Sequence, residues 1–306
     1  MHEERKQNLF PLYIPSKGRS KIMLTPKYLD RMGCAYRLVV EEQEYSEYLA
    51  AFGGDKSKLL VLDMEYKRKY RLCDSYGLSR STGSGPARNF IWDHSISEGH
   101  THHWIMDDNI KGFYRINNNN KNLVRTPAFF RAMEDFSLRY KNVGMAGPEY
   151  KGFTHATVIK PHFRLNTRVY SCNLIRNDLP FRWRGRYNED SILSLDMLKA
   201  GWCTVLFLSL LQNKINTQRM RGGNTSELYT NGTREKSQML AREHPDVSKV
   251  VTRYGRVHHL TDHSRFSQMR LQLADGVVLP QGVDNFGMEL LVDPSAPPPS
   301  KRRTPQ

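Results

Sequence analysis

The sequence predicts an α/β fold in which a mainly parallel sheet is covered by helices. Short apolar segments of strand length alternate with longer segments in which apolar residues recur at helical spacing. This alternation repeats along the first half of the chain, as it does in parallel sheets whose crossovers are helices. Ligands of such sheets bind beyond the carboxyl ends of the strands, so we expect functional loops after Ile14, Val40, Leu62 and Met106.

The individual elements follow from apolar spacing and from helix-start signals. Pro86 stands where a helix should begin, and Thr126-Pro127 form an N-cap and first-turn pair. Expected strands cover residues 12–14, 36–40, 59–62, 103–106, 142–146, 169–175 and 203–208. Expected helices cover 42–52, 191–200 and 233–243, together with those opened by the two proline signals. The asparagines 117–120 are expected to form a polar loop.

The composition indicates a globular protein with a polyanionic partner. Of the 306 residues, 39% are hydrophobic, enough for a packed core, and the formal net charge is +15. Such charge favours nucleic acid or nucleotides, although a basic surface also serves solubility. Four scattered cysteines without zinc-ligand spacing are interpreted as reduced thiols in a cytoplasmic protein. The most apolar stretch, 203–211, is too short to span a bilayer, so no membrane partner is expected.

The triplet Asp107-Asp108-Asn109 directly follows an expected strand. Two carboxylates and an amide offer hard oxygen ligands that suit Mg²⁺ or Mn²⁺ bridging a diphosphate. The same residue types are also common in turns and caps. Their expected place at the carboxyl edge of an α/β sheet favours a metal site.

The pair Glu189-Asp190 opens an expected helix. Acidic residues stabilise a helix start, so the pair can be a simple cap. Together with an earlier acid motif, a carboxylate here can instead act as the general base that deprotonates an acceptor hydroxyl.

Two glycine-bearing loops and two late histidines complete the candidate set. In the loop Pro15-Ser16-Lys17-Gly18-Arg19, the glycine permits close backbone approach and the two cations suit phosphate. The loop 83–89 precedes a helix start but lacks both the P-loop and the dinucleotide patterns. His258 and His259 could complete a metal site formed by residues earlier in the sequence. Alternatively, they could lie on the surface or in the core.

Taken in order, these motifs resemble a GT-A type glycosyltransferase. The resemblance rests on residues 13–19, 85–89, 104–109 and 188–190, and it covers roughly residues 8 to 266. The best match is the phage-type TET-associated glycosyltransferase family, whose members are linked to sugar addition onto 5-hydroxymethylcytosine in DNA. It implies one domain over 1–290, with a nucleotide-sugar half at about 8–150 and an acceptor half at about 151–290. Residues 291–306 are expected to form a disordered basic tail.

The resemblance also assigns roles to residues of the donor site. It implies a nucleotide-sugar donor, with uridine as the family default, and either Mn²⁺ or Mg²⁺. Pro15, Ser16 and Arg19 would line the base and ribose, and Glu41 would approach the base. Arg88 would approach the diphosphate or sugar, and Asp107 the ribose or sugar hydroxyls. A flexible loop containing Gly222 and Gly223 would close over the donor.

The metal and the base are assigned in the same way. Asp108 and Asn109 would hold the metal, with His258 or His259 completing its shell. Asn109 stands where the family pattern has an aspartate, and a neutral amide is a weaker ligand, so Asp108 or a late histidine would carry more of the metal binding. Asp190 would be the base if the anomeric centre is inverted.

Two basic clusters are candidates for binding DNA. One contains Lys67, Arg68 and Lys69; the other contains Arg182, Trp183, Arg184 and Arg186 and immediately precedes Glu189-Asp190. The second cluster is preferred for the acceptor side, with Trp183 stacking on a base, although either can be a solvated loop. Placing a hydroxymethylated base in a deep cleft would be aided by flipping it from the stack.

Three other functions compete with sugar transfer to DNA. The same fold could glycosylate a protein, a glycan or a small molecule. A metal-dependent nuclease would use the same acids to activate water, but it gives no reason for the Pro-Ser-Lys-Gly-Arg loop. A non-catalytic nucleic-acid-binding protein gives no reason for two acid motifs.

Overall fold

The computed structural model describes residues 8–157, 162–215, 234–253 and 255–279. Strands and helices alternate through the first half, and the helix starts expected at Pro86 and Thr126-Pro127 are present. The strands are β1 (Leu12–Pro15), β2 (Arg37–Val40), β3 (Leu59–Val61), β4 (His102–Met106), β5 (Ile110–Asn117), β6 (Asn120–Val124), β7 (Val143–Tyr150), β8 (Phe163–Leu165), β9 (Cys172–Arg176), β10 (Cys203–Lys214), β11 (Ser248–Arg253) and β12 (Arg256–Thr261). The helices are α1 (Leu24–Met32), α2 (Tyr45–Ala51), α3 (Glu65–Arg68), α4 (Gly85–Ser97), α5 (Ala128–Leu138), α6 (Glu189–Lys199) and α8 (Arg234–Glu243).

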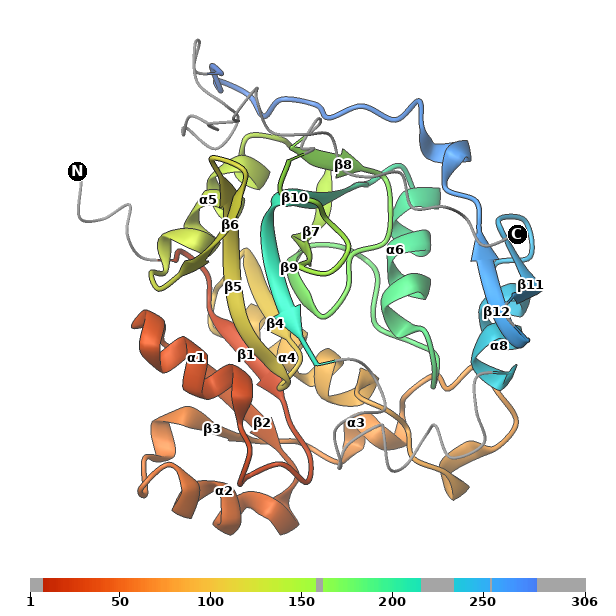
Figure 1. The fold of residues 1–306 in the computed structure, drawn as a ribbon. Coiled ribbons are helices and arrows are strands. Elements are labelled where there is room, and N and C mark those ends of the chain that lie inside the picture. The colour runs from red at the N-terminus through yellow and green to blue at the C-terminus, as the bar shows by residue number, and fades with distance from the viewer. Residues whose placement is uncertain (1–7, 158–161, 216–233, 254, 280–306) are drawn as a thin grey trace.

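Ten of the described strands form one sheet in the order β3-β2-β1-β4-β9-β7-β10-β5-β6, with β8 paired to β10 (Figure 1). Neighbours among β3, β2, β1 and β4 are parallel. Beyond β4 the sheet is mixed, because β9 runs antiparallel to both β4 and β7, while β7 and β10 are parallel. The α/β class is confirmed and is consistent with the GT-A type. The parallel part of the sheet, β3-β2-β1-β4, is the part whose strands are followed by the loops expected to be functional.

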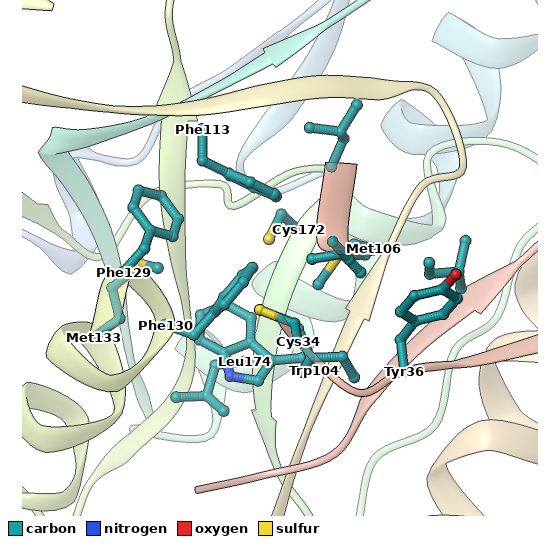
Figure 2. Close-up of a cluster of buried hydrophobic side chains, with 14 of the residues drawn as sticks. Cys34, Tyr36, Trp104, Met106, Phe113, Phe129, Phe130, Met133, Cys172 and Leu174 are labelled. Atoms are coloured by element: carbon teal, nitrogen blue, oxygen red, sulfur yellow. The ribbon is translucent and has the colours of Figure 1, made fainter. Parts of the chain in front are cut away.

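Strict alternation along the central strands divides the core between the two faces of the sheet. On one face, Leu12, Ile14, Trp104 and Met106 pack with residues of α1, α2 and α5. On the other face, Tyr13 and Ile105 pack with residues of α4 and α6. Strands buried on both faces are apolar at every position, which explains the short apolar runs in the sequence. Figure 2 shows part of the first cluster, where Trp104 and Phe130 pack close to Phe129 and Met133.

The asparagine tetrad is the turn of a hairpin between β5 and β6, so the expected loop is only two residues long. Asn118 and Asn119 both have positive φ angles, of 47° and 56°. Such angles suit the tight turns that match the twist of paired strands, and asparagine tolerates them better than most residues. The sequence pattern missed β5, β6 and α1. α1 has no side-chain N-cap, β6 is largely polar, and the apolar residues of β5 are interrupted by Lys111, Gly112 and Arg115.

The last described elements form a small layer outside the main sheet. β11 and β12 pair as a two-stranded sheet, and α8 packs on α6 beside them (Figure 1). Ile192, Leu195 and Leu198 of α6 meet Leu240 of α8 in a separate apolar cluster. This layer brings the start of α8 against the start of α6, where Asn188 donates to the Lys236 carbonyl.

All four cysteines are free thiols, as expected. No helix among the described residues has the length and apolar character needed to cross a membrane. The tail 291–306 and the glycines Gly222 and Gly223 lie outside the described residues.

Candidate active site

A cavity of about 420 Å³ opens beyond the carboxyl ends of β1, β2 and β4. Its wall also includes the first residues of α4 and α6 and the end of β10. The location is the one that parallel α/β sheets use for ligands. The cavity lies between the two halves of the chain, and the layer formed by α8 and β12 contributes Lys236 and His259 to its rim.

At one end of the cavity, the loop after β1 is tied to the acid triplet after β4. Ser16 Oγ donates to Asp108 Oδ2 at 2.8 Å, and Arg19 pairs with Asp108 Oδ1. Thr25, at the start of α1, donates to the Asp107 carbonyl at 2.6 Å and accepts from the Ile110 amide at 2.8 Å. The loop after β1 and the acid triplet are therefore joined directly by side-chain contacts. The hydroxyl of the buried Thr25 also holds the backbone of the turn that carries the acids.

Glu41 lies at the same end, just past β2. It forms ion pairs with Lys67 at 2.6 Å and Lys17 at 3.3 Å. Burial alone would raise the pKa of Glu41, but the hydrogen bonds from Lys67 and Gln43 outweigh it and lower the pKa. Lys67 was predicted to contact DNA, and the structure instead places it in the wall of the cavity with the donor-site residues.

At the other end of the cavity, Arg88 joins the two acid motifs. Its guanidinium donates to Asp107 Oδ1 and to Asp190 Oδ1, both at 2.9 Å, and its own side chain is only 2% exposed. Ser84 Oγ donates to Glu189 at 2.9 Å, so the first turns of α4 and α6 face each other. Arg88, Asp107 and Asp190 were predicted from separate motifs, and the fold brings them into direct contact.

Asn188 fixes the direction in which α6 begins. It adopts a left-handed conformation with φ 57°, and its amide donates to the Lys236 carbonyl at 2.5 Å. Asparagine is among the few residues that enter this conformation readily. The turn starts the helix so that Glu189 and Asp190 both line the cavity.

Lys214 is a site residue that the sequence pattern did not single out. Its ammonium pairs with Asp107 Oδ2 and donates to Ser171 Oγ at 2.8 Å, and that serine also bonds to Tyr150 Oη at 2.7 Å. The one local signal is that β10, the longest apolar strand, turns polar over 212–214. Only the sheet order, which places the end of β10 near the acid triplet, reveals its role.

The two central carboxylates have opposite pKa shifts. Burial would raise the pKa of Asp107, but Lys214 and Arg88 outweigh it and lower the pKa to about 2. Burial also acts on Asp190, where one arginine is opposed by the charges of Glu189 and Asp107, and the pKa rises to about 7. Asp107 is therefore a permanent anion, whereas Asp190 can take up and release a proton near neutral pH.

The residues predicted to hold a metal do not form a preorganised metal site. Both oxygens of Asp108 are occupied by Ser16 and Arg19. Asn109 also lines the cavity, and its buried Oδ1 has no hydrogen-bond partner. In the parts of the chain that the structure describes, no three His, Cys, Asp or Glu side chains converge as metal ligands do. The described residues therefore offer Mn²⁺ or Mg²⁺ no preformed set of free carboxylates at the triplet, where the carboxylates of Asp107 and Asp108 are both paired with cationic side chains.

The two late histidines lie on opposite faces of β12, as alternation requires. His259 lines the cavity, and burial lowers its pKa to about 4, so it is neutral. His258 is exposed and does not line the cavity. Of the two, only His259 is placed to touch a ligand there.

The preferred basic cluster is largely internal, which corrects the expectation that it binds DNA. Trp183 is 1% exposed and lies under Arg88, with 4.5 Å from its ring centre to the guanidinium carbon. Arg186 is also 1% exposed and pairs with Asp74 at 2.6 Å, and Arg184 pairs with Asp196 at 2.8 Å. A tryptophan in that position cannot stack on a base. Only Arg182, paired with Asp93, is exposed.

The remaining two candidates are exposed: Arg68 at the end of α3 and Lys69 directly after it, and both pair with Glu65. An exposed aromatic side chain that the sequence pattern missed lies closer to the site. Phe153 is 67% exposed in the loop after β7, lines the cavity, and meets the Tyr150 ring edge-on at 5.4 Å.

Comparison with known proteins identifies the family of the chain. The model of one protein family, described as TET-Associated Glycosyltransferase, matches residues 10–223, from β1 past the end of β10. No curated protein and no solved structure matches the chain. The match covers more than half of the chain and contains the acid triplet, Arg88, Asp190 and Lys214. The chain therefore belongs to the TET-associated glycosyltransferase family.

Proposed function

We propose that this glycosyltransferase moves a sugar from a nucleotide-sugar donor, with UDP-sugar as the first choice, to the hydroxyl of 5-hydroxymethylcytosine in DNA. The transferred group is a hexosyl or N-acetylhexosaminyl unit. The observation that carries the chemistry is Asp190, a carboxylate at the cavity wall whose pKa is raised to about 7. A base with that pKa is half ionised at neutral pH, which is where general-base catalysis is most effective.

The reaction assigned to this site is a single displacement. Asp190 takes the proton from the acceptor hydroxyl as its oxygen forms a bond to the anomeric carbon. The bond between that carbon and the phosphate oxygen breaks, and its electron pair leaves with the nucleoside diphosphate. Arg88 holds Asp190 and Asp107 in a fixed geometry, which lowers the cost of ordering the site during the reaction.

The donor would lie along the cavity from Glu41 to Asp107. Ser16, Arg19 and Glu41 form the end suited to base and ribose, because they offer hydroxyl, guanidinium and carboxylate groups close together. Arg88 and Lys214 form the end suited to phosphate and sugar. Pro15 and Lys17 line the same cavity, where Pro15 would contact the base or ribose and Lys17 is suited to phosphate.

A nucleobase acceptor is supported by the aromatic side chains at the mouth of the cavity. Phe153 is exposed there, and Tyr150 and Tyr170 line the wall below it. Flipped or unpaired bases are held by stacking on such rings. The net charge of +15 supplies attraction for DNA phosphates.

The test is to incubate the protein with a panel of nucleotide sugars and DNA containing 5-hydroxymethylcytosine, then to weigh the nucleosides. We expect a mass gain of one sugar unit on the modified base alone, with unmodified DNA as the matched control. Asp190→Asn should slow the gain by about 10²- to 10⁴-fold. Free nucleoside diphosphate appearing only with a protein, glycan or small-molecule acceptor would overturn the DNA acceptor, and strand cleavage without mass gain would indicate a nuclease.

A further inference from the structure

The carboxylates of this site are already neutralised by side chains of the protein. Asp108 is held by Arg19, Asp107 by Arg88 and Lys214, and Asp190 by Arg88. A divalent cation needs anionic oxygens with free lone pairs directed at one point. At the acid triplet, three of the four carboxylate oxygens are instead bound to guanidinium or ammonium groups, and the fourth accepts from the Ser16 hydroxyl. Replacing any of these cations by a metal would leave a buried cation without its partner.

The cavity nevertheless carries enough positive charge to accept a diphosphate. Among its described lining residues are six cationic side chains and five carboxylates. The cations are Lys17, Arg19, Lys67, Arg88, Lys214 and Lys236. Even with every carboxylate ionised, the net charge of these lining side chains is therefore positive. The low local dielectric strengthens the attraction between the cationic side chains and a bound anion.

Lys214 is the best placed of these cations. Its side chain is 14% exposed, so the ammonium is largely desolvated but still reaches the cavity. Desolvation would lower the pKa of Lys214, but the charge of Asp107 and the phenol of Tyr150 outweigh it and raise the pKa. Asp107 thus fixes the orientation of the Lys214 ammonium before a ligand binds. A preorganised cation can stabilise negative charge on a ligand without a further rearrangement of the site.

Lys236 approaches the same region from the other side. It lines the cavity from the start of α8, and its carbonyl is anchored by Asn188 at 2.5 Å. The charges that act on it include those of Glu189, Asp190 and Lys214, which line the same cavity. Residue 236 lies beyond the residues that the family model matches, and this contribution to the site is therefore specific to the later part of the chain.

We propose that Lys214, assisted by Arg88 and Lys236, binds the donor diphosphate and neutralises the departing nucleoside diphosphate, so that transfer needs no divalent cation. The proposal rests on the proposed glycosyl transfer. When the bond from the anomeric carbon to phosphate breaks, the phosphate oxygen gains one negative charge and the electron pair of the bond. The Lys214 ammonium receives this charge in an ion pair, while the acceptor proton passes to Asp190.

The first experiment uses the unaltered protein. Binding of UDP, GDP, CDP and ADP is measured by isothermal titration calorimetry in EDTA and again with Mn²⁺ or Mg²⁺ added. We expect the preferred diphosphate to bind in EDTA with a Kd within about threefold of the value with metal, a difference under 1 kcal/mol. Binding that is lost in EDTA and restored by either metal would overturn the proposal.

The second experiment tests the lysine. Lys214→Met should weaken diphosphate binding in EDTA by about ten- to a hundredfold, the loss expected for one charge-assisted contact. Lys214→Arg keeps the charge and should recover most of the affinity. Lys249→Met, at an exposed position of β11 outside the cavity, is the matched control. Unchanged binding in Lys214→Met, with a melting temperature close to that of the unaltered protein, would overturn the role of Lys214.

Failure of the proposed function would look different. A protein that binds the diphosphate in EDTA through Lys214, yet adds no sugar to hydroxymethylated DNA, supports the cationic site and rejects the acceptor. Sugar transfer to DNA that stops in EDTA and resumes with Mn²⁺ supports the acceptor and rejects the metal-free site.

Discussion

At the scale of single residues, the site is organised by buried cations whose positions could not be read from motifs. Arg88 was predicted near the diphosphate, but its main structural role is to connect Asp107 to Asp190. Burial acts to raise the pKa of both carboxylates, but the pKa of Asp107 is about 2 and that of Asp190 about 7. Lys214 and Arg88 outweigh burial at Asp107, whereas at Asp190 the effect of Arg88 is opposed by the charges of Glu189 and Asp107.

The raised pKa of Asp190 predicts the pH dependence of transfer. The base must be ionised to accept a proton, so kcat/KM should rise with pH through about 7 and level off above it. The groups that set this value are Arg88, Glu189, Asp107 and Lys214. Steady-state kinetics between about pH 5.5 and pH 9 would measure the profile.

Two outcomes bear on this prediction. Asp190→Asn should lower kcat by about 10²- to 10⁴-fold, the usual contribution of a general base, and the remaining activity should lose the inflection near pH 7. A profile in the unaltered protein that is flat across that range would contradict Asp190 as the base.

A second prediction concerns the contribution of Phe153 to binding of the DNA acceptor. Stacking of a base on an aromatic side chain is worth about 1–3 kcal/mol, so Phe153→Ala should weaken binding of hydroxymethylated DNA by about five- to a hundredfold. Phe153→Tyr keeps the ring and should bind normally. Fluorescence anisotropy with labelled DNA gives the affinities. Nucleoside diphosphate binding should not change in either variant, and a parallel loss of it would indicate a distorted cavity rather than a lost stacking contact.

At the scale of elements, part of the cavity wall is a loop whose position is fixed by the buried side chain of Arg186. Arg186 donates to the carbonyls of Gly77 at 2.6 Å and Arg80 at 3.0 Å, and it pairs with the buried Asp74. The residues that follow, 81–84, line the cavity. The basic cluster that was predicted to bind DNA thus contains a residue that shapes the donor-site wall from inside the protein.

Removing that arginine should destabilise the fold. Arg186→Met leaves Asp74 as a buried charge without its partner, and the expected loss is about 3–5 kcal/mol in the free energy of unfolding. The double variant Arg186→Met/Asp74→Asn should recover part of the loss, because no buried charge remains unpaired. Urea denaturation measures both. Arg68→Met, at an exposed side chain, is the control and should change stability by less than about 1 kcal/mol.

Two close approaches between elements also require glycine. A Cβ on Gly147 would lie 2.1 Å from the Cys172 carbonyl oxygen, between β7 and β9. A Cβ on Gly85 would lie 1.8 Å from the Tyr70 hydroxyl, at the start of the helix that carries Arg88. These contacts lock the start of α4 and the centre of the sheet, and neither glycine belongs to a recognisable phosphate-binding pattern.

At the scale of the whole molecule, the excess of positive charge predicts how DNA binding responds to salt. Each phosphate neutralised by Lys or Arg releases condensed counterions, so log affinity should fall linearly with log salt concentration. Titrations at several NaCl concentrations would give a slope close to about 0.9 times the number of phosphate contacts on double-stranded DNA. An affinity independent of salt would contradict a DNA acceptor, whereas nucleoside diphosphate binding in the enclosed cavity should respond far less.

The sequence by itself determined the α/β class, the strands that carry the loops, and the residue types at their ends. These features are local: apolar alternation and helix-start signals act over a few residues, and Asp107, Asp190 and the loop at 15–19 stand where such patterns end. The family resemblance rests on the same local motifs and their order, and the family match agrees with it.

Only the tertiary structure decided which of these groups meet. The sheet order inserts β9 between β4 and β7 and brings the end of β10 to the acid triplet, pairings between strands far apart in sequence. That order placed Lys214 on Asp107. Packing of the later layer against the cavity turned His259 rather than His258 towards it, and packing of the loop before α6 buried Trp183 beneath Arg88. Side-chain spacing along a strand specifies a face but not a neighbour, because the neighbour is set by packing of the complete sheet.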